Sequence, residues 1–183
     1  KKYNFKNLVV WNRGVDTELF NPNKRDTNSK DRQLTYVGRV AIEKNIEEFL
    51  KLKGNYNKIV VGDGPELQKY INKYPEINFV GVKTGEELAK YYANADVFVF
   101  PSKTDTLGNV ILEALASGTP IAAYPVTGPI DILTDEKINT LDNNLLQSVK
   151  KALKVKRVDC RNFTLKLTWD KCVKEFLEYM VNV

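Results

Sequence analysis

Two carboxylates flank a predicted helix start in the segment FPSKTDTLGNVILEALASG, residues 100–118. An apolar run ends at Pro101, a polar loop that contains Asp105 follows, and a helical pattern begins near Gly108. Glu113 lies one turn into this helix, and because helical side chains lean toward the N-terminus, it points back at the loop. The free N–H groups and the dipole of a helix start favour an anion or an oxygen-rich ligand. We therefore expect both carboxylates to converge on one pocket, where they can accept hydrogen bonds from adjacent hydroxyls of a ligand.

The apolar neighbours of Glu113 predict that its helix is buried, because Ile111, Leu112 and Ala114 leave it little polar surface. A lone buried carboxylate is costly unless a partner satisfies it. That partner can be a ligand. A purely structural alternative is equally open, in which Asp105 caps the helix and Glu113 pairs with a nearby Lys or Arg.

A second candidate group is cationic and lies in VGRVAIEKN, residues 37–45. Gly38 follows a predicted strand and lets the backbone approach a ligand closely. Arg39 and Lys44 flank the turn into the next helix, so we expect both at the carboxyl edge of a sheet. Two cations there can neutralise a diphosphate and stabilise it as it leaves. The alternative is a surface salt bridge between one of them and Glu43.

The segment VGDGPE, residues 61–66, follows a strand and opens a helix. It imitates the start of a dinucleotide-binding fingerprint, but Leu67 occupies the third glycine position. We interpret Gly62 and Gly64 as parts of a tight structural turn.

Short apolar runs rich in Val, Ile, Phe and Tyr alternate with helical patterns along the chain. Runs that are apolar on both faces are typical of parallel strands covered on both sides. We predict an α/β fold, a doubly wound, Rossmann-like parallel sheet of about six strands, with ligands at the carboxyl ends near a switch point. The predicted strands are residues 7–11, 33–37, 58–62, 77–81, 96–100 and 119–124.

Composition excludes several classes of site. The 183 residues contain no His, which rules out a Ser–His–Asp triad or a His-containing metal site within this chain. No divalent-metal motif is visible, so we expect neither a metal nor another cofactor. Cys160 and Cys172 lack a CxxC spacing, which favours reduced thiols and a cytoplasmic protein. The net charge of +5 permits peripheral contact with the inner face of an anionic membrane, whereas no motif indicates nucleic-acid binding.

Taken together, these segments resemble the retaining glycosyltransferases of the GT-B fold, group 1, which use nucleotide-activated sugars. The segment at 12–22 looks like the family's interdomain entry, YVGRVAIEKN like its phosphate-binding turn, and residues 105–113 like its acidic motif, two carboxylates with seven residues between them. The match runs from about Gly38 to Asp131 and is thinner at 8–22 and around Trp169.

The resemblance implies a role for each charged residue singled out above. Arg39 and Lys44 would contact the diphosphate of the donor and help it leave. Glu113 would hold the ribose hydroxyls, and Asp105 would approach hydroxyls of the transferred sugar. The family usually has Glu at the position of Asp105, so the shorter side chain puts that role in doubt.

The resemblance also assigns donor contacts to uncharged positions. Val82, just past its strand, would lie against the base, and Gly38 would let the backbone approach the donor. The backbone N–H groups that would meet the sugar or the distal phosphate belong to Leu107, Gly108, Asn109 and Val110.

We expect residues 1–183 to form a single nucleotide-sugar-binding domain, the C-terminal half of a two-domain enzyme. The acceptor would bind mainly to the N-terminal domain, which this chain lacks, so the chain alone is expected to be inactive. The reaction implied is transfer of a hexose from a UDP- or GDP-sugar to a glycan or lipid acceptor. Three alternatives are a dinucleotide-dependent oxidoreductase domain, a non-catalytic sugar-nucleotide-binding module and a sugar-nucleotide epimerase.

Overall fold

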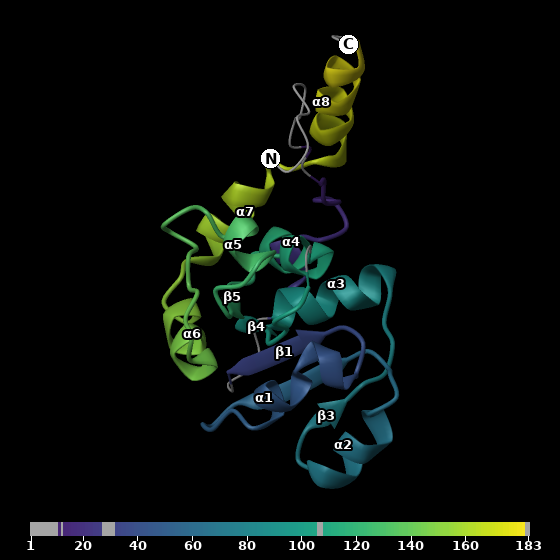
Figure 1. Ribbon diagram of the computed structural model, residues 1–183, viewed down its shortest axis with the longest axis vertical. Helices are drawn as coiled ribbons and strands as arrows, with labels where there is room; N and C mark the ends of the chain where they lie inside the picture. The colour runs from purple at the N-terminus through teal and green to yellow at the C-terminus, as the bar shows by residue number, and fades with distance from the viewer. Residues whose placement is uncertain (1–10, 12, 27–31, 106–107, 182–183) are drawn as a thin grey trace, which may run out of the picture.

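The computed structural model describes residues 11, 13–26, 32–105 and 108–181. Its centre is a parallel sheet with the strand order β3-β2-β1-β4-β5 (Figure 1). The chain winds outward from β1 in one direction and then, from β4, in the other. The strands are β1 (Gln33–Val37), β2 (Asn57–Val61), β3 (Asn78–Phe79), β4 (Val97–Phe100) and β5 (Ile121–Ala123).

The doubly wound parallel sheet confirms the predicted fold class, with five strands in the described part of the chain instead of about six. The predicted strand at 7–11 lies outside the described residues, apart from Trp11, which belongs to no strand. The prediction at 77–81 was too long, because only Asn78 and Phe79 pair with β2 at this edge of the sheet.

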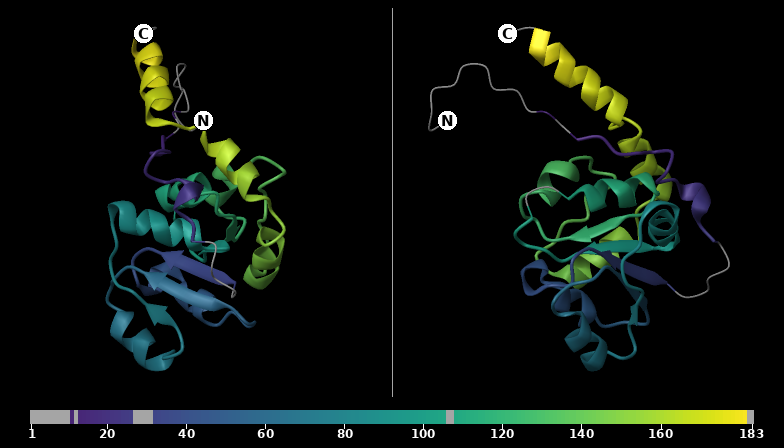
Figure 2. Two further views of the ribbon diagram at one scale, coloured as in Figure 1. Left: turned by 180° about the vertical axis from the view of Figure 1, so that it is seen from behind. Right: turned by 90° about the vertical axis from the view of Figure 1, so that its right-hand side faces the viewer.

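Helices cover both faces of the sheet (Figures 1 and 2). On one face, Leu34 and Val97 pack with side chains of α1, α2 and α6. On the other, Phe98 and Ile121 pack with side chains of α3, α4 and α7. The helices are α1 (Ile46–Leu50), α2 (Leu67–Lys73), α3 (Gly85–Asn94), α4 (Asn109–Ala116), α5 (Pro129–Ile132), α6 (Leu145–Ala152), α7 (Arg157–Thr164) and α8 (Trp169–Val181), with 3-10 turns η1 (Pro22–Lys24) and η2 (Ile42–Lys44).

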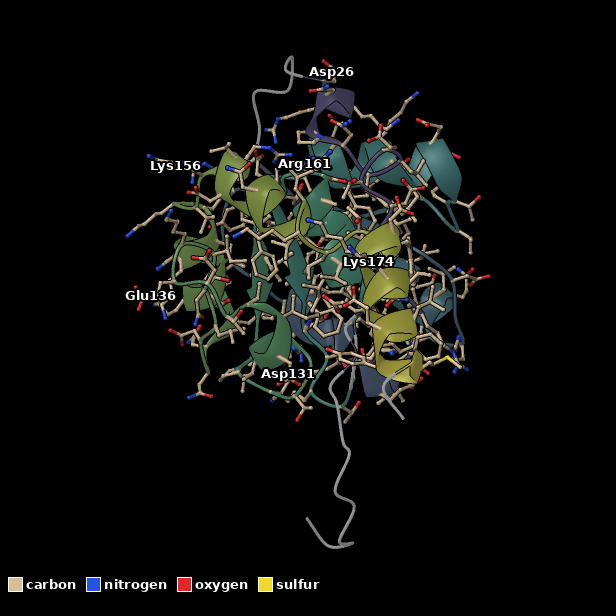
Figure 3. All side chains as sticks on the ribbon, turned by 90° about the horizontal axis from the view of Figure 1, so that it is seen from above. Asp26, Asp131, Glu136, Lys156, Arg161 and Lys174 are labelled. Carbon is tan, nitrogen blue, oxygen red and sulfur yellow. The ribbon has the colours of Figure 1, made fainter. Side chains whose placement is uncertain are left out.

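The first described segment is tied to the C-terminal helices. Arg161, on α7, donates hydrogen bonds to the carbonyls of Thr17, Phe20 and Ala116 (Figure 3). Beyond α7, helix α8 extends away from the sheet (Figure 2). Among the residues that the structure describes, no helix is both long and apolar enough to span a membrane.

Candidate functional site

A cavity of about 520 Å³ opens where the strand order reverses, at the carboxyl ends of β1 and β4. Doubly wound sheets bind their ligands at this point, because the connections on either side diverge and leave a crevice. Most of the predicted site residues meet here. The lining consists of Tyr36, Val37, Gly38, Arg39, Glu43, Lys44, Phe100, Pro101, Ser102, Asp105, Gly108, Asn109 and Val110.

A second cavity of about 280 Å³ adjoins the first and shares Val37, Gly38 and Arg39 with it. Val82 lines this second cavity and is largely exposed. The predicted base-binding position and the predicted phosphate-binding position therefore lie along one edge of the sheet. Leu107, also predicted, lies outside the described residues.

Glycines allow the backbone to pack closely at this edge. Gly38 donates its N–H to Val61 O at 3.0 Å, and Gly62 donates to Gly81 O at 2.8 Å, which continues the sheet ladder beyond β1 and β2. Gly62 has a φ of +137°, and a Cβ there would lie 2.0 Å from Gly38 O. The close packing at Gly62 supports the interpretation of VGDGPE as a structural turn, although Gly62 also lines the smaller cavity.

Lys44 and Asp105 form an ion pair across the larger cavity. Lys44 ends the turn η2, and its Nζ lies 2.5 Å from Oδ1 of Asp105 in the β4–α4 loop. Asn45 holds the two loops together, because its Nδ2 donates to Pro101 O at 3.0 Å. The alternative in which Asp105 caps the helix is wrong, since Gly108 is the N-cap of α4 and no side chain caps it. The sequence predicted both charges at the site but not that they pair.

Arg39 makes the surface salt bridge that was the alternative to its functional role. Its Nη1 lies 3.5 Å from Oε1 of Glu43, and both side chains are more than half exposed. Such an exposed pair contributes little to stability, so the guanidinium can turn to an anion at low cost. Two acidic side chains thus accompany the two cations of the cavity.

Tyr36 holds the backbone of the turn that carries Arg39 and Lys44. Its hydroxyl donates to Arg39 O at 2.7 Å. Burial raises the pKa of Tyr36, and the negative charges of Asp105 and Glu43 raise it further, so the hydroxyl stays protonated as a donor. The sequence offered no signal for this role, because Tyr36 sits within an apolar strand.

Glu113 is half-buried on α4, and its partner is a tyrosine. The hydroxyl of Tyr92 donates to Oε2 of Glu113 at 2.9 Å. No Lys or Arg in the described part of the chain forms an ion pair with Glu113, so that predicted alternative is wrong. Burial raises the pKa of Glu113, and the hydrogen bond from Tyr92 partly offsets this. Glu113 itself does not line the 520 Å³ cavity but stands one turn behind Asn109 and Val110, which do.

Two further features complete the description of the site. Arg13, from the first described segment, donates through Nη1 to Oδ1 of Asn109 at 3.3 Å and so adds a cation near the start of α4. The described residues contain no group of three or more His, Cys, Asp and Glu side chains that could hold a metal ion.

The raised pKa of Glu113 predicts that its charge costs stability. A carboxyl whose folded-state pKa exceeds its ordinary value of 4.5 destabilises the fold as pH rises through that window, because ionisation is harder in the folded state. We expect Glu113→Gln, which can still accept from Tyr92, to raise the thermal unfolding midpoint by roughly 1–4 °C at neutral pH. Below pH 4.5, where the carboxyl is protonated in both the folded and the unfolded chain, Glu113→Gln should raise the unfolding midpoint very little. An equal rise at neutral and at acidic pH would show that the charge of Glu113 is not the cause.

The comparisons with known proteins show the family of the chain. The model of the family described as glycosyl transferases group 1 matches residues 18–157. The chain belongs to this family. The match includes both cavities and the residues from Arg39 to Glu113 discussed above.

The chain spans only part of the length of its relatives and of the solved structures with a similar fold. It is 36% identical over 151 residues to a GDP-mannose-dependent alpha-mannosyltransferase of Corynebacterium glutamicum, covering 77% of this chain and 36% of the relative. It is similar in fold to sucrose-phosphate synthase of Thermosynechococcus elongatus (TM-score 0.80, 24% identity, 93% of this chain and 51% of that one). It also resembles HepE of Anabaena, solved with UDP and glucose (TM-score 0.72, 15% identity, 93% and 56%). The chain thus spans about a third of that relative and about half of these two structures.

Proposed function

We propose that this chain is the donor-binding half of a retaining glycosyltransferase that transfers a hexose from a UDP- or GDP-sugar to an acceptor alcohol on a glycan or lipid. The observation that carries the proposal is the cavity at the reversal of strand order, where Lys44, Arg39 and the start of α4 meet. A diphosphate fits cations and free helix N–H groups, and a sugar fits the adjacent carboxylate of Asp105.

Each charged residue has a defined task in this proposal. Lys44 and Arg39 neutralise the diphosphate and stabilise it as the leaving group, without a metal ion. Asp105 accepts from the transferred sugar, and Glu113 from the ribose. Val82 lies against the base in the smaller cavity.

The names of the relatives support this class of donor. The Corynebacterium relative is GDP-mannose-dependent, and HepE was solved with UDP and glucose. We propose that the acceptor is held mainly by a further domain, because the chain spans about half of its structural neighbours. Peripheral contact with an anionic membrane stays a prediction from the net charge of +5.

Calorimetry with UDP, GDP and NAD tests the proposal on this chain. We expect weak binding of UDP or GDP and no binding of NAD. Tighter binding of NAD would overturn the proposal in favour of a dinucleotide-dependent oxidoreductase. We expect no sugar transfer by the chain alone, and measurable turnover would contradict the assignment of the acceptor to another domain.

A further inference from the structure

We infer that Tyr92 is a positioning residue that sets the geometry and charge of Glu113 for nucleotide binding. The inference rests on the proposed function, in which Glu113 receives the ribose hydroxyls. It starts from an unusual placement: Tyr92 is a fully buried side chain on α3, yet it carries a hydroxyl. A buried hydroxyl without a partner is costly, so Phe would suit this core position unless the hydroxyl has a task.

The surroundings of Tyr92 hold its ring in place. The ring packs edge-on against Phe20 at 5.7 Å and Phe98 at 5.6 Å between centroids. The hydroxyl of Thr119 donates to Tyr92 O at 2.6 Å, which ties the backbone of α3 to the segment after α4. A rigid phenol of this kind can orient the group it binds, because little conformational freedom is left for it to lose.

The hydroxyl of Tyr92 is directed at one oxygen of Glu113. It donates to Oε2 at 2.9 Å, and no described residue donates a hydrogen bond to Oε1. One oxygen is therefore held by the core, and in the proposed function the other accepts from the ribose. Burial raises the pKa of Tyr92 well above its ordinary value, with the charge of Glu113 as a further cause, so the phenol stays a neutral donor.

The same hydrogen bond favours the ionised form of Glu113. Burial raises the pKa of Glu113, and the bond from Tyr92 lowers it. Loss of the hydroxyl removes the lowering contribution, so the carboxyl takes up a proton at a higher pH than in the wild type. Tyr92 thus acts on the ligand through Glu113, in both orientation and charge.

Tyr92→Phe tests the inference with two ligands. The first is UDP or GDP, whichever the wild-type chain binds, and the second is the 2′,3′-dideoxy analogue of that nucleotide. We expect Tyr92→Phe to weaken binding of the ribonucleotide by roughly five- to tenfold, the size of one hydrogen bond, and to leave binding of the dideoxy analogue nearly unchanged. In a Glu113→Ala background, which leaves no side-chain oxygen for Tyr92 or for the ribose, the same substitution should have little further effect. As pH is lowered, Tyr92→Phe should lose ribonucleotide binding at a higher pH than the wild type does.

Tyr91→Phe, one position earlier on α3, is the matched control and should behave as the wild type. Equal losses for both ligands, or an unchanged pH dependence, would overturn the positioning role while the proposed function stands. If the wild-type chain binds neither UDP nor GDP, the proposed function fails, and the inference fails with it. Thermal unfolding of each variant shows whether Tyr92→Phe keeps the fold, and the pH dependence serves as a second readout.

Discussion

Lys44→Met is expected to weaken binding of UDP or GDP by about tenfold or more, and Asp105→Asn to strengthen it by about threefold. The first effect follows from the loss of a half-buried cation that lines the larger cavity and pairs with Asp105 in the β4–α4 loop. Hydrogen bonds to charged groups are about twice as strong as neutral ones, and the aliphatic Met keeps the packing of the lysine stem.

The opposite effect of Asp105→Asn follows from the ion pair. Lys44 forms an ion pair with Asp105 at 2.5 Å, so a diphosphate has to compete with a carboxylate for the same cation. Asn removes the competing charge and the repulsion between Asp105 and the phosphates. In the proposed function, Asp105 also contacts the transferred sugar, so the gain is expected for the free nucleotide and not for the nucleotide-sugar.

Calorimetry at constant ionic strength measures both variants, because salt screens such contacts. Lys69→Met is the matched control, since Lys69 also pairs with a carboxylate, that of Glu66, but lines neither site cavity. Weaker nucleotide binding by Asp105→Asn would contradict the competition, and unchanged binding by Lys44→Met would remove Lys44 from the site.

The sequence predicted the parts of the site that depend on local pattern. Apolar runs indicated where strands end, and the residues after those ends, Arg39, Asp105 and Asn109, meet at the carboxyl edge because all strands are parallel. The strand ending at Phe100 and the start of α4 were predicted within a residue or two. These features need only the periodicity of neighbouring residues.

The pairings within the site could not be predicted in this way. Lys44 meets Asp105 because β1 lies beside β4, and Tyr92 meets Glu113 because α3 packs on α4. Both pairings depend on the order of strands and the packing of helices, which a single sequence does not show. Tyr92 in particular looks like any other aromatic residue on the apolar face of a helix.

Helix α7, Arg157–Thr164, was also missed, for a different reason. Its segment RVDCRNFT has few apolar residues, so little hydrophobic surface marks it as a helix that packs on the core. The buried contacts of Arg157 compensate: its guanidinium donates to the carbonyls of Ala93, Ala95 and Ser117. Long polar side chains that satisfy buried carbonyls can thus stabilise a helix that hydrophobic patterning does not indicate.

Gly62→Ala is expected to destabilise the fold by about 4 kcal/mol or more, whereas Gly81→Ala should cost only about 1–2 kcal/mol. Both glycines have positive φ, +137° and +73°, so both substitutions carry a backbone penalty. They differ in space, because a Cβ on Gly62 would lie 2.0 Å from Gly38 O, whereas a Cβ on Gly81 would meet nothing within 4 Å. Denaturant unfolding of the two variants therefore separates steric overlap from backbone strain.

The overlap at Gly62 also links stability to ligand binding. Relief of the clash requires the ends of β1 and β2 to move apart, and this displaces Gly38, which lines both cavities. We therefore expect Gly62→Ala to lose nucleotide binding even at temperatures where it stays folded, and Gly81→Ala to keep it. Equal destabilisation of the two variants would show that the positive φ, and not the overlap with Gly38 O, sets the cost of Gly62→Ala. Retained binding by a folded Gly62→Ala variant would show that the close approach of β1 and β2 is not needed to shape the site.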